Sequence, residues 1–241
     1  MSLPNFDEIY RTRLLYFLFF LGYATIFDKG FRRESMTFSG FTNADFDVFK
    51  IDGFANRMDA LKTNIRPKLE ALGQHFAPTL SALTGEEMFA HVAKHTRRTV
   101  NPPKDTWVAF SSNSRGYKML PHFQIGLWET HVFIWFAVIY EAPNKAELGV
   151  KLSKQLNSIY KTTNGDFSWS GDHMKPDATL HRDLSKDELK SLFERLQTVK
   201  KAEILCGYQI PREEAVAMTS EEFIEKVNIV FKELLPLYKL A

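Results

Sequence analysis

The residues best suited to chemistry are basic side chains in two nearby segments. They are, in chain order, Arg97, Arg98, Arg115 and Lys118. Guanidinium groups make paired hydrogen bonds to phosphates and carboxylates, so these segments predict an anion-binding site. A rigid Asn-Pro-Pro sequence at 101–103 would restrict the motion of Arg97 and Arg98. Two simpler interpretations stay open: a solvated basic helix end that complements the helix dipole, and a plain polar hairpin loop.

The segment that follows has the period-two pattern of a β-hairpin. With 129–130 as the turn, Trp128 pairs with His131, and the side chains sort onto two faces. One face is wholly apolar and comprises Phe123, Ile125, Leu127, Val132, Ile134, Phe136 and Val138. The other face is mixed and comprises His122, Gln124, Gly126, Trp128, His131, Phe133, Trp135 and Ala137. A slip of one residue would mix the two sets, so the pattern favours this register.

The mixed face is the second candidate for chemistry. It has aromatic walls, a few polar groups and a glycine that would let another group approach the backbone, as ligand pockets do. Within it, His122, Gln124, Trp128 and His131 would line the pocket, and His122 or His131 would be the acid–base group. The alternative is a half-exposed sheet face whose His and Gln side chains meet water.

Other chemical groups give weaker signals. His91 and His95 are four residues apart on a helix predicted over 85–97, so both could face one metal ion. The segment has no Glu after the first His and no evident third ligand, so we predict no metal site. Asp172 and His173 could supply a base to a pocket, but a surface turn is the favoured interpretation. The sequence contains no nucleophile motif of serine or cysteine hydrolases and no paired-carboxylate motif.

Strands and helices must position these groups. Strands are predicted at 107–110, 122–128, 131–140 and 203–210, with weaker candidates at 167–170 and 178–183. Apolar spacing of three and four, together with capping residues, predicts helices at 42–49, 56–72, 85–97, 145–160 and 186–200. A last helix is capped by Ser220 and ended by Pro236. Pro67 is expected to kink or divide the second helix, and Gly73 to end it.

Consecutive strands joined by short loops imply mainly antiparallel pairing. We therefore expect an α+β fold, with a mainly antiparallel sheet, a central hairpin and helices covering the sheet, as a single domain over 36–241. The 241 residues, 44% of them hydrophobic, are ample for a packed core. A formal net charge of +2 argues against an overall polyanion binder. The single Cys206 excludes an internal disulfide and fits a reducing cytoplasm.

Residues 1–35 form a leader of different character. Its apolar run at 14–27 is shorter than the roughly 20 residues that a membrane span requires. The first interpretation is an upstream artefact or dispensable extension, with translation beginning at Met36. A helix docked on the domain and a membrane anchor are the second and third, and a membrane association is not expected.

Four stretches carry a resemblance to a known family: DFDVFKIDGF at 45–54, RPKLEALG at 66–73, HVAKHTRRTVNPPKDTWVAF at 91–110 and RGYKMLPHFQIGLWETHVFIWFAVIYE at 115–141. They resemble the YktB-like family of uncharacterised bacterial proteins, from Phe38 to about Leu237. The resemblance implies a cytoplasmic α+β protein of one domain whose chains begin near Met36. It implies no particular activity, cofactor or catalytic residue.

Three functions remain as hypotheses. The first is a cytoplasmic module, with or without enzymatic activity, that binds a small anionic metabolite or nucleotide. Its anion would be held by Arg97, Arg98, Arg115 and Lys118, with the mixed face lining the apolar part. The second is RNA or single-stranded nucleic-acid binding, which the near-neutral charge disfavours. The third is a protein-interaction or structural role. The sequence predicts neither a cofactor nor an oligomeric state.

Overall fold

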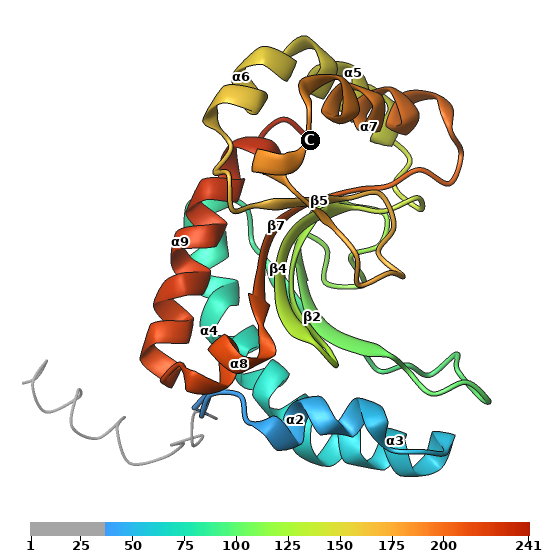
Figure 1. Cartoon of the computed structure of the whole chain (residues 1–241), viewed down its shortest axis with the longest axis vertical. Coiled ribbons are helices and arrows are strands. Elements are labelled where there is room, and N and C mark those ends of the chain that lie inside the picture. The colour runs from blue at the N-terminus through green and yellow to red at the C-terminus, as the bar shows by residue number, and fades with distance from the viewer. Residues whose placement is uncertain (1–36) are drawn as a thin grey trace, which may run out of the picture. The chain divides into compact units, whose positions relative to one another are not determined.

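A computed structural model describes residues 37–241 of the chain (Figure 1). The described residues form one compact unit. The predictions made for the leader therefore lie outside the described residues. Among the helices of the described part, none combines the length and the apolar character that crossing a membrane requires.

A seven-stranded sheet is the centre of the fold, and every strand pairing in it is antiparallel. The strands lie in the order β1-β2-β3-β4-β7-β5-β6. Their bounds are β1 Phe89–Val92, β2 Asp105–Ser111, β3 His122–Trp128, β4 His131–Val138, β5 Ser168–Ser170, β6 Thr179–Leu180 and β7 Ile204–Pro211. The predicted α+β fold class is confirmed.

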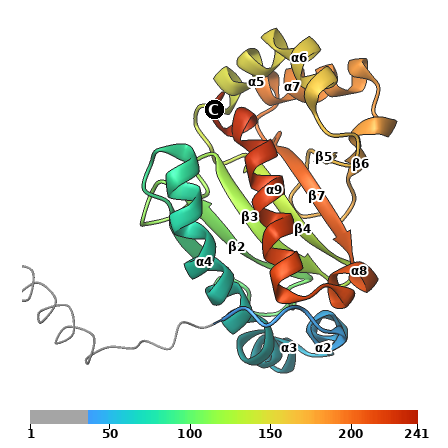
Figure 2. The same ribbon diagram turned by 90° about the vertical axis from the view of Figure 1, so that its left-hand side faces the viewer.

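The helices are mainly α-helical, with short 3-10 and π segments between them. In chain order they are α2 Asn43–Asp47, η2 Val48–Lys50, α3 Phe54–Ala60, the π segment η3 Leu61–Ile65, α4 Arg66–Thr84, α5 Lys145–Lys154, α6 Leu156–Thr162, η4 His181–Asp183, α7 Lys186–Thr198, α8 Arg212–Ala217 and α9 Ser220–Tyr238. Helices α4 and α9 run across one face of the sheet, while α5, α6 and α7 gather at one end (Figure 2).

The predicted register of the central hairpin is confirmed, since Phe123 pairs with Phe136 and Leu127 with Val132. The seven residues of the predicted apolar face all belong to the main hydrophobic core. This face packs under α9, where Phe123 lies 5.2 Å from the ring of Phe231. The sheet therefore separates a convex face covered by helices from a concave face on its other side (Figure 1).

The predicted helix end at Gly73 is wrong. Helix α4 continues through Gly73 to Thr84 and ends at Gly85, whose φ of 79° gives the left-handed conformation typical of helix ends. Gly73 instead allows the sheet to approach, because a Cβ there would lie 3.0 Å from the Cβ of Ala90. Pro67 does divide the long helical segment, since it stands in the first turn of α4, where proline is tolerated.

The predicted helix over 85–97 is also wrong. Thr84 is the last residue of α4, and Phe89–Val92 forms strand β1, which pairs with β2. Local capping signals were overridden here by tertiary pairing, which completes the hydrogen bonds of an edge of the sheet. His91 and His95 consequently share no helix face. The Nε2 atom of His91 lies 2.9 Å from the carbonyl oxygen of Asn113.

The remaining helices follow the predictions with shifted ends. Helix α7 has the expected capping box, in which Ser185 accepts from the backbone N–H of Glu188. The predicted helix 145–160 is divided at Gln155 into α5 and α6. Helix α9 is capped by Thr219 rather than by Ser220, and it passes through Pro236 to Tyr238. Of the weaker strands, 167–170 forms β5, whereas only Thr179–Leu180 of 178–183 is extended.

Candidate functional site

The concave face of the sheet is closed rather than open to solvent. Trp128, Phe133 and Trp135 on this face are only 7%, 3% and 5% exposed, and His122 is wholly buried. The interpretation of a half-exposed face whose His and Gln side chains meet water is therefore wrong for His122 and Gln124, whereas His131 is half-buried. The loop between β5 and β6 crosses this face and, together with the sheet, encloses a small cavity.

Two aromatic–glycine pairs shape the floor of the cavity. Phe133 lies opposite Gly126 on β3, and Trp135 lies opposite Gly207 on β7. A Cβ at position 126 would overlap the ring of Phe133, and one at position 207 would lie 2.9 Å from Cε3 of Trp135. The glycines thus let both rings lie directly over the backbone, an arrangement known to stabilise glycine in sheets. The group that approaches the backbone at Gly126 is the protein's own phenyl ring.

Strands β2, β3 and β4 contribute six residues to the cavity wall, namely Asp105, Trp107, Gln124, Trp128, Phe133 and Trp135, and β5 and β7 add Ser170, Leu205 and Gln209. Side chains of the β5–β6 loop, among them His173 and Lys175, close the opposite side. The cavity offers about 20 Å³ to the centres of water-sized groups. This is room for one or two such groups, so the cavity is suited to the head of a ligand and not to a whole metabolite.

Asp105 is the least compensated polar group in the cavity wall. It begins β2, where period-two alternation places it on the same face as Trp107. It is 4% exposed, and no other described residue donates a hydrogen bond to its carboxylate. Burial raises its pKa to about 6, although the charges of Arg98 and His173 act in the opposite direction. Such a carboxylate could accept a proton or pair with a cation.

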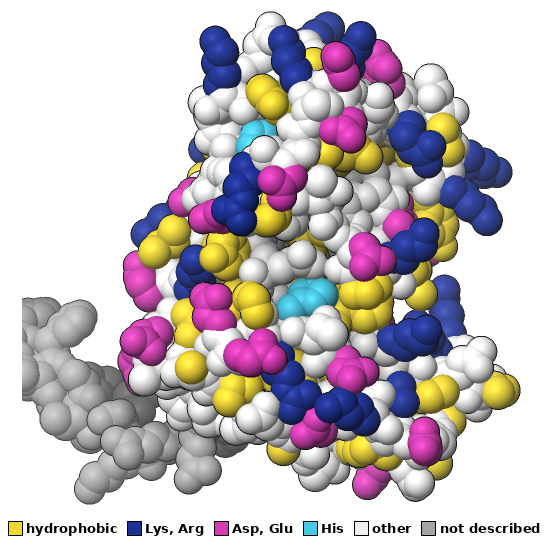
Figure 3. Space-filling model, viewed as in Figure 1, with side chains coloured by type: hydrophobic (Ala, Val, Ile, Leu, Met, Phe, Trp, Pro, Cys, Tyr) yellow, Lys and Arg dark blue, Asp and Glu magenta, His cyan; other side chains and the backbone are white. Residues whose placement is uncertain are grey.

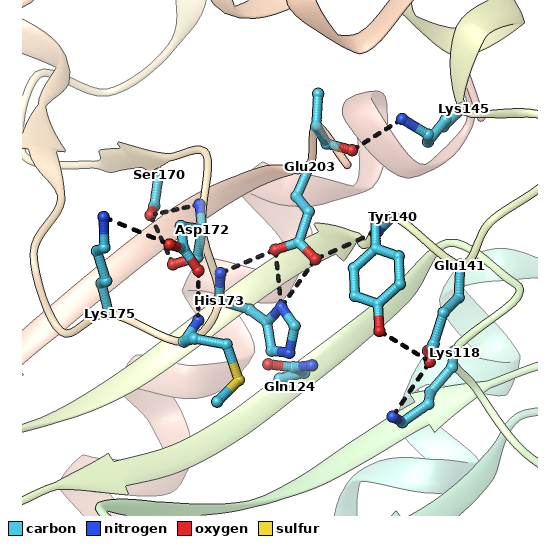
Figure 4. A network of polar contacts seen from close by, with 12 residues as sticks. Lys118, Gln124, Tyr140, Glu141, Lys145, Ser170, Asp172, His173, Lys175 and Glu203 are labelled. Atoms are coloured by element: carbon cyan, nitrogen blue, oxygen red, sulfur yellow. Dashed lines mark hydrogen bonds and ion pairs between the residues drawn. The ribbon is translucent and has the colours of Figure 1, made fainter. Parts of the chain in front are cut away.

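His173 and Glu203 form a buried acid–base pair beside the cavity (Figure 4). The Nδ1 atom of His173 lies 2.7 Å from Oε2 of Glu203, and the backbone N–H of His173 donates to the same oxygen at 2.9 Å. The backbone N–H of Tyr140 donates to the other oxygen at 3.3 Å. Glu203 is thereby fixed, and its fixed carboxylate orients the imidazole. In Figure 4, Gln124 is drawn beside the imidazole edge that faces away from Glu203.

The protonation of His173 depends on Glu203. Burial by itself lowers the pKa of His173, but the hydrogen bond and the charge of Glu203 outweigh it and raise the pKa above 6.5. The ion pair therefore stabilises the fold fully below pH 6.5, and this contribution is lost as the pH rises through the folded-state pKa.

Replacing Glu203 by glutamine tests this pair. We expect the pKa of His173 in the Glu203→Gln variant to fall below 6.5, because burial then acts without the opposing charge. The lost charge-assisted hydrogen bond should cost about 2 kcal/mol of unfolding free energy near pH 6. Titration of the imidazole by NMR measures the pKa, and urea unfolding measures the stability. An unchanged His173 titration would show that Glu203 does not control it.

Two further histidines of this face are held neutral. The Nδ1 atom of His122 lies 2.7 Å from the carbonyl oxygen of Leu120, and its Nε2 lies 2.8 Å from Nε2 of Gln124. The Nε2 atom of His131 lies 2.9 Å from Nε2 of Gln209. Burial lowers the pKa of both histidines to about 4. They orient two amide side chains, and His173 is the group with the pKa suited to proton transfer near neutral pH.

Of the eight residues predicted to form the site, Gln124 and Trp128 line the cavity. His122 and His131 do not line it, but they contact the lining residues Gln124 and Gln209, respectively. The charge of Arg98 acts on the carboxyl of Asp105. The charge of Lys118 acts on His173, and that of Arg97 acts on Tyr140. Lys118 also pairs with Glu141 at 3.5 Å. Arg115 is exposed in the β2–β3 loop.

The space-filling view gives the surroundings of the cavity. Figure 3 shows a hollow in the middle of this side of the molecule, with a histidine near its centre and Lys and Arg side chains above and below it. The predicted basic residues belong to the β1–β2 and β2–β3 loops, which join strands that are neighbours in the sheet.

Asp172, His173 and Glu203 are the residues that could hold a metal ion, since ligand atoms of all three lie within 4.8 Å of one another. Their atoms already have partners. Asp172 accepts from the backbone N–H of Met174 at 2.9 Å and pairs with Lys175 at 3.5 Å, and His173 bonds directly to Glu203. A metal would have to replace these contacts. The group is therefore a His173–Glu203 pair next to a turn in which Asp172 accepts from the backbone N–H of Met174.

Sequence reasoning did not find Asp105 and Glu203, and it favoured a surface turn for His173. The signal for Asp105 was present, because extending the predicted strand back from Trp107 by two residues places Asp105 on the mixed face. Glu203 stood at the start of a predicted strand without any sign of its partner. Its pairing with His173 depends on where the β5–β6 loop crosses the sheet.

Fold and site together define an antiparallel α+β protein with a buried, carboxylate- and tryptophan-lined cavity on the concave face of its sheet. The sequence pattern described as a domain of unknown function (DUF1054) matches residues 41–238, and the chain belongs to this family.

Relatives carry the name UPF0637 protein. One from Bacillus velezensis is 57% identical over 206 residues, which cover 86% of this chain and 98% of the relative. One from Bacillus licheniformis is 56% identical over 201 residues, covering 83% and 95%. One from Bacillus mycoides is 56% identical over 206 residues, covering 86% and 99%.

Proposed function

We propose that the protein binds a small anionic metabolite at the mouth of the concave-face cavity. The observation that carries this proposal is that three basic side chains act electrostatically on groups in or beside one cavity. Arg97, Arg98 and Lys118 come from two different loops, yet their charges reach Tyr140, Asp105 and His173, which stand around the same site. Convergent charges beside a preformed pocket are typical of binding sites for charged ligands.

His173 adds to the support for an anionic ligand. Glu203 raises the pKa of this imidazole above its usual 6.5, which favours the positively charged form. The Lys118–Glu141 contact at 3.5 Å is partly exposed, so it holds Lys118 weakly and leaves it available to a ligand. A phosphate or carboxylate at the mouth would meet Lys118, Arg98 and Arg97 without displacing any buried group.

Single-stranded nucleic acid is a weaker candidate. Binding of bases by stacking requires open aromatic surfaces, and Trp128, Phe133 and Trp135 are at most 7% exposed. Affinity that falls steeply with salt would nevertheless favour nucleic acid over a metabolite. A protein-interaction role is the third candidate, and a monomer by light scattering would count against self-association. We also infer a cytoplasmic location, and identity of this family with the YktB-like family that the motifs resemble.

A thermal-shift screen with a library of phosphorylated and carboxylated metabolites tests the proposal. We expect at least one anion to stabilise the protein, and the Lys118→Gln and Arg98→Gln variants to bind it about tenfold more weakly, since each loses one charge-assisted contact. The matched control is Lys190→Gln, which removes an exposed lysine paired with Glu194 on α7. Equal loss of affinity in the control, or no stabilising anion, would contradict the proposal.

Acid–base catalysis is a second candidate function, supported by the orientation of His173. Glu203 binds its Nδ1 and leaves Nε2 without a partner among the described residues, on the cavity side. A histidine fixed in this way can give or take a proton at Nε2. The experiment incubates the protein with each anion found in the screen and follows its NMR spectrum. Turnover that His173→Gln abolishes supports an enzyme, and an unchanged spectrum supports a binding module.

A further inference from the structure

The cavity interior differs in charge from the basic residues proposed to hold the anion. Arg97, Arg98 and Lys118 do not line the cavity, whereas Asp105 lines it with a buried carboxylate to which no other described residue donates a hydrogen bond. An anionic group placed inside would be repelled by Asp105, and the free energy of burying its charge would exceed that gained from its contacts. The part of the ligand that enters the cavity therefore differs from the part that stays at the mouth.

Gln124 also presents an acceptor to the interior. The Nδ1–H of His122 donates to Leu120, so the Nε2 of this neutral histidine is an acceptor. The contact at 2.8 Å then requires the amide nitrogen of Gln124 to donate to His122. The amide oxygen of Gln124 is left for the cavity, and no other described residue donates to it. Asp105 and Gln124 thus both present hydrogen-bond acceptors to the cavity.

The remaining wall is aromatic, with four large rings from three neighbouring strands: Trp107, Trp128, Phe133 and Trp135. Phe133 and Trp135 lie nearly parallel, with ring centroids 6.3 Å apart. Aromatic faces attract cations, most strongly when water is excluded, and rings around a carboxylate are a recurrent means of binding alkylammonium groups. Lys175 also lines the cavity, but its ammonium group pairs with Asp172 and is exposed.

The size of the cavity limits which hydrogen-bond-donating groups of a ligand can enter it. About 20 Å³ accommodates an ammonium group or a small methylated ammonium group, whereas a guanidinium, a nucleobase or a sugar ring requires the β5–β6 loop to move. A water-sized polar head with several donors and a positive charge matches Asp105, Gln124 and the aromatic wall, while His173 on the loop side is paired with Glu203.

We propose that the cavity binds the ammonium group of a small zwitterionic metabolite, with the cation between Asp105 and the tryptophan rings and the anionic end among Arg98, Lys118 and Arg97. The anionic end rests on the proposed function. The ammonium site stands independently, on Asp105, Gln124 and the aromatic wall.

Titration with ammonium and methylammonium chloride, followed by the indole N–H signals of the tryptophans, tests the ammonium site. Three of the four tryptophans line the cavity, while Trp169 lies in the core with its indole N–H on His181, so it is an internal control. We expect saturable shifts of Trp107, Trp128 and Trp135 at millimolar concentrations and none of Trp169. Methanol, a neutral molecule of similar size to methylammonium, should give a markedly weaker response.

The charge of Asp105 predicts two further results. The Asp105→Asn variant should bind both cations at least about tenfold more weakly. In the wild type, binding at about pH 5 should be roughly tenfold weaker than at about pH 7.5, because the pKa of Asp105 is about 6. The titratable and charged groups that act on Asp105 are Arg98, His173 and Tyr117, and His173 becomes more positive over the same range. The Asp59→Asn variant, at an exposed position, should bind like the wild type.

Three outcomes separate this inference from the proposed function. No saturable shift up to about 100 mM, or an equal response to methanol, overturns the ammonium site. Phosphoethanolamine that binds more tightly than ethanolamine, with the gain lost in Lys118→Gln, supports both proposals. Phosphoethanolamine and ethanolamine that bind equally leave the ammonium site supported and contradict the anionic mouth.

Discussion

An alanine at position 207 is expected to lower the free energy of unfolding by about 4 kcal/mol or more. Gly207 lies on β7, between Trp135 of β4 and Ser168 of β5. A Cβ at this position would overlap the carbonyl oxygen of Ile134 and lie 2.9 Å from Cε3 of Trp135. The overlapping atom belongs to the backbone of the neighbouring strand, so relief requires β4 and β7 to separate. Equilibrium unfolding in urea measures this loss.

Gly116→Ala is the matched control. No atom lies within 4 Å of a Cβ at position 116, and its backbone is not in the left-handed region, so the stability should change by less than about 0.5 kcal/mol. A loss of less than about 1 kcal/mol in Gly207→Ala would mean that β7 does not approach Ile134 as closely as described. In a folded fraction of the variant, displaced Trp135 should also weaken the binding of ammonium.

The Asp105→Asn variant is expected to have the opposite effect, a gain in unfolding free energy of up to about 3 kcal/mol near pH 7.5. Burial raises the pKa of Asp105 from 3.8 to about 6, so the folded state holds the proton more tightly than the unfolded state does. The stability that the protonated carboxyl contributes is present at low pH and is lost as the pH rises from about 4 to about 6. Asparagine carries no charge and does not show this loss.

Unfolding in urea at about pH 7.5 and about pH 4 tests the sign of the effect. The gain should disappear at the lower pH, where Asp105 is protonated in the folded state and its side chain resembles asparagine in charge. Asp59→Asn, at an exposed site, should change stability by less than about 0.5 kcal/mol at both values. A variant less stable than the wild type at pH 7.5 would reveal a donor that stabilises the carboxylate of Asp105.

A stabilising Asp105→Asn variant would carry a functional meaning. A buried charge without a partner lowers stability, and proteins place such groups where a ligand or a reaction uses them. The ammonium group proposed for the cavity would pair with this carboxylate and remove the cost on binding. The two experiments therefore constrain one another, because the same Asp105→Asn substitution should raise stability and weaken the binding of cations.

The sequence by itself determined the central hairpin and the elements with strong local signals. Strict alternation over Phe123 to Val138 fixed both the register and the buried face, because a slip of one residue would bury polar groups. Ser185 and Glu188 identified the start of α7, since a capping box is completed within four consecutive residues. With these elements and short connections, the antiparallel α+β class followed.

Only the tertiary structure decided the rest. The segment 85–97 has a helical capping signal, but Phe89–Val92 pairs with β2, because an edge of the sheet offers hydrogen bonds that outweigh local preference. The cavity joins Asp105 of β2, His173 of the β5–β6 loop and Glu203 beside β7. No periodicity relates these positions, since the spacing of side chains repeats only within an element. Their proximity, and the raised pKa values of Asp105 and His173, arise from the path of one loop across the concave face.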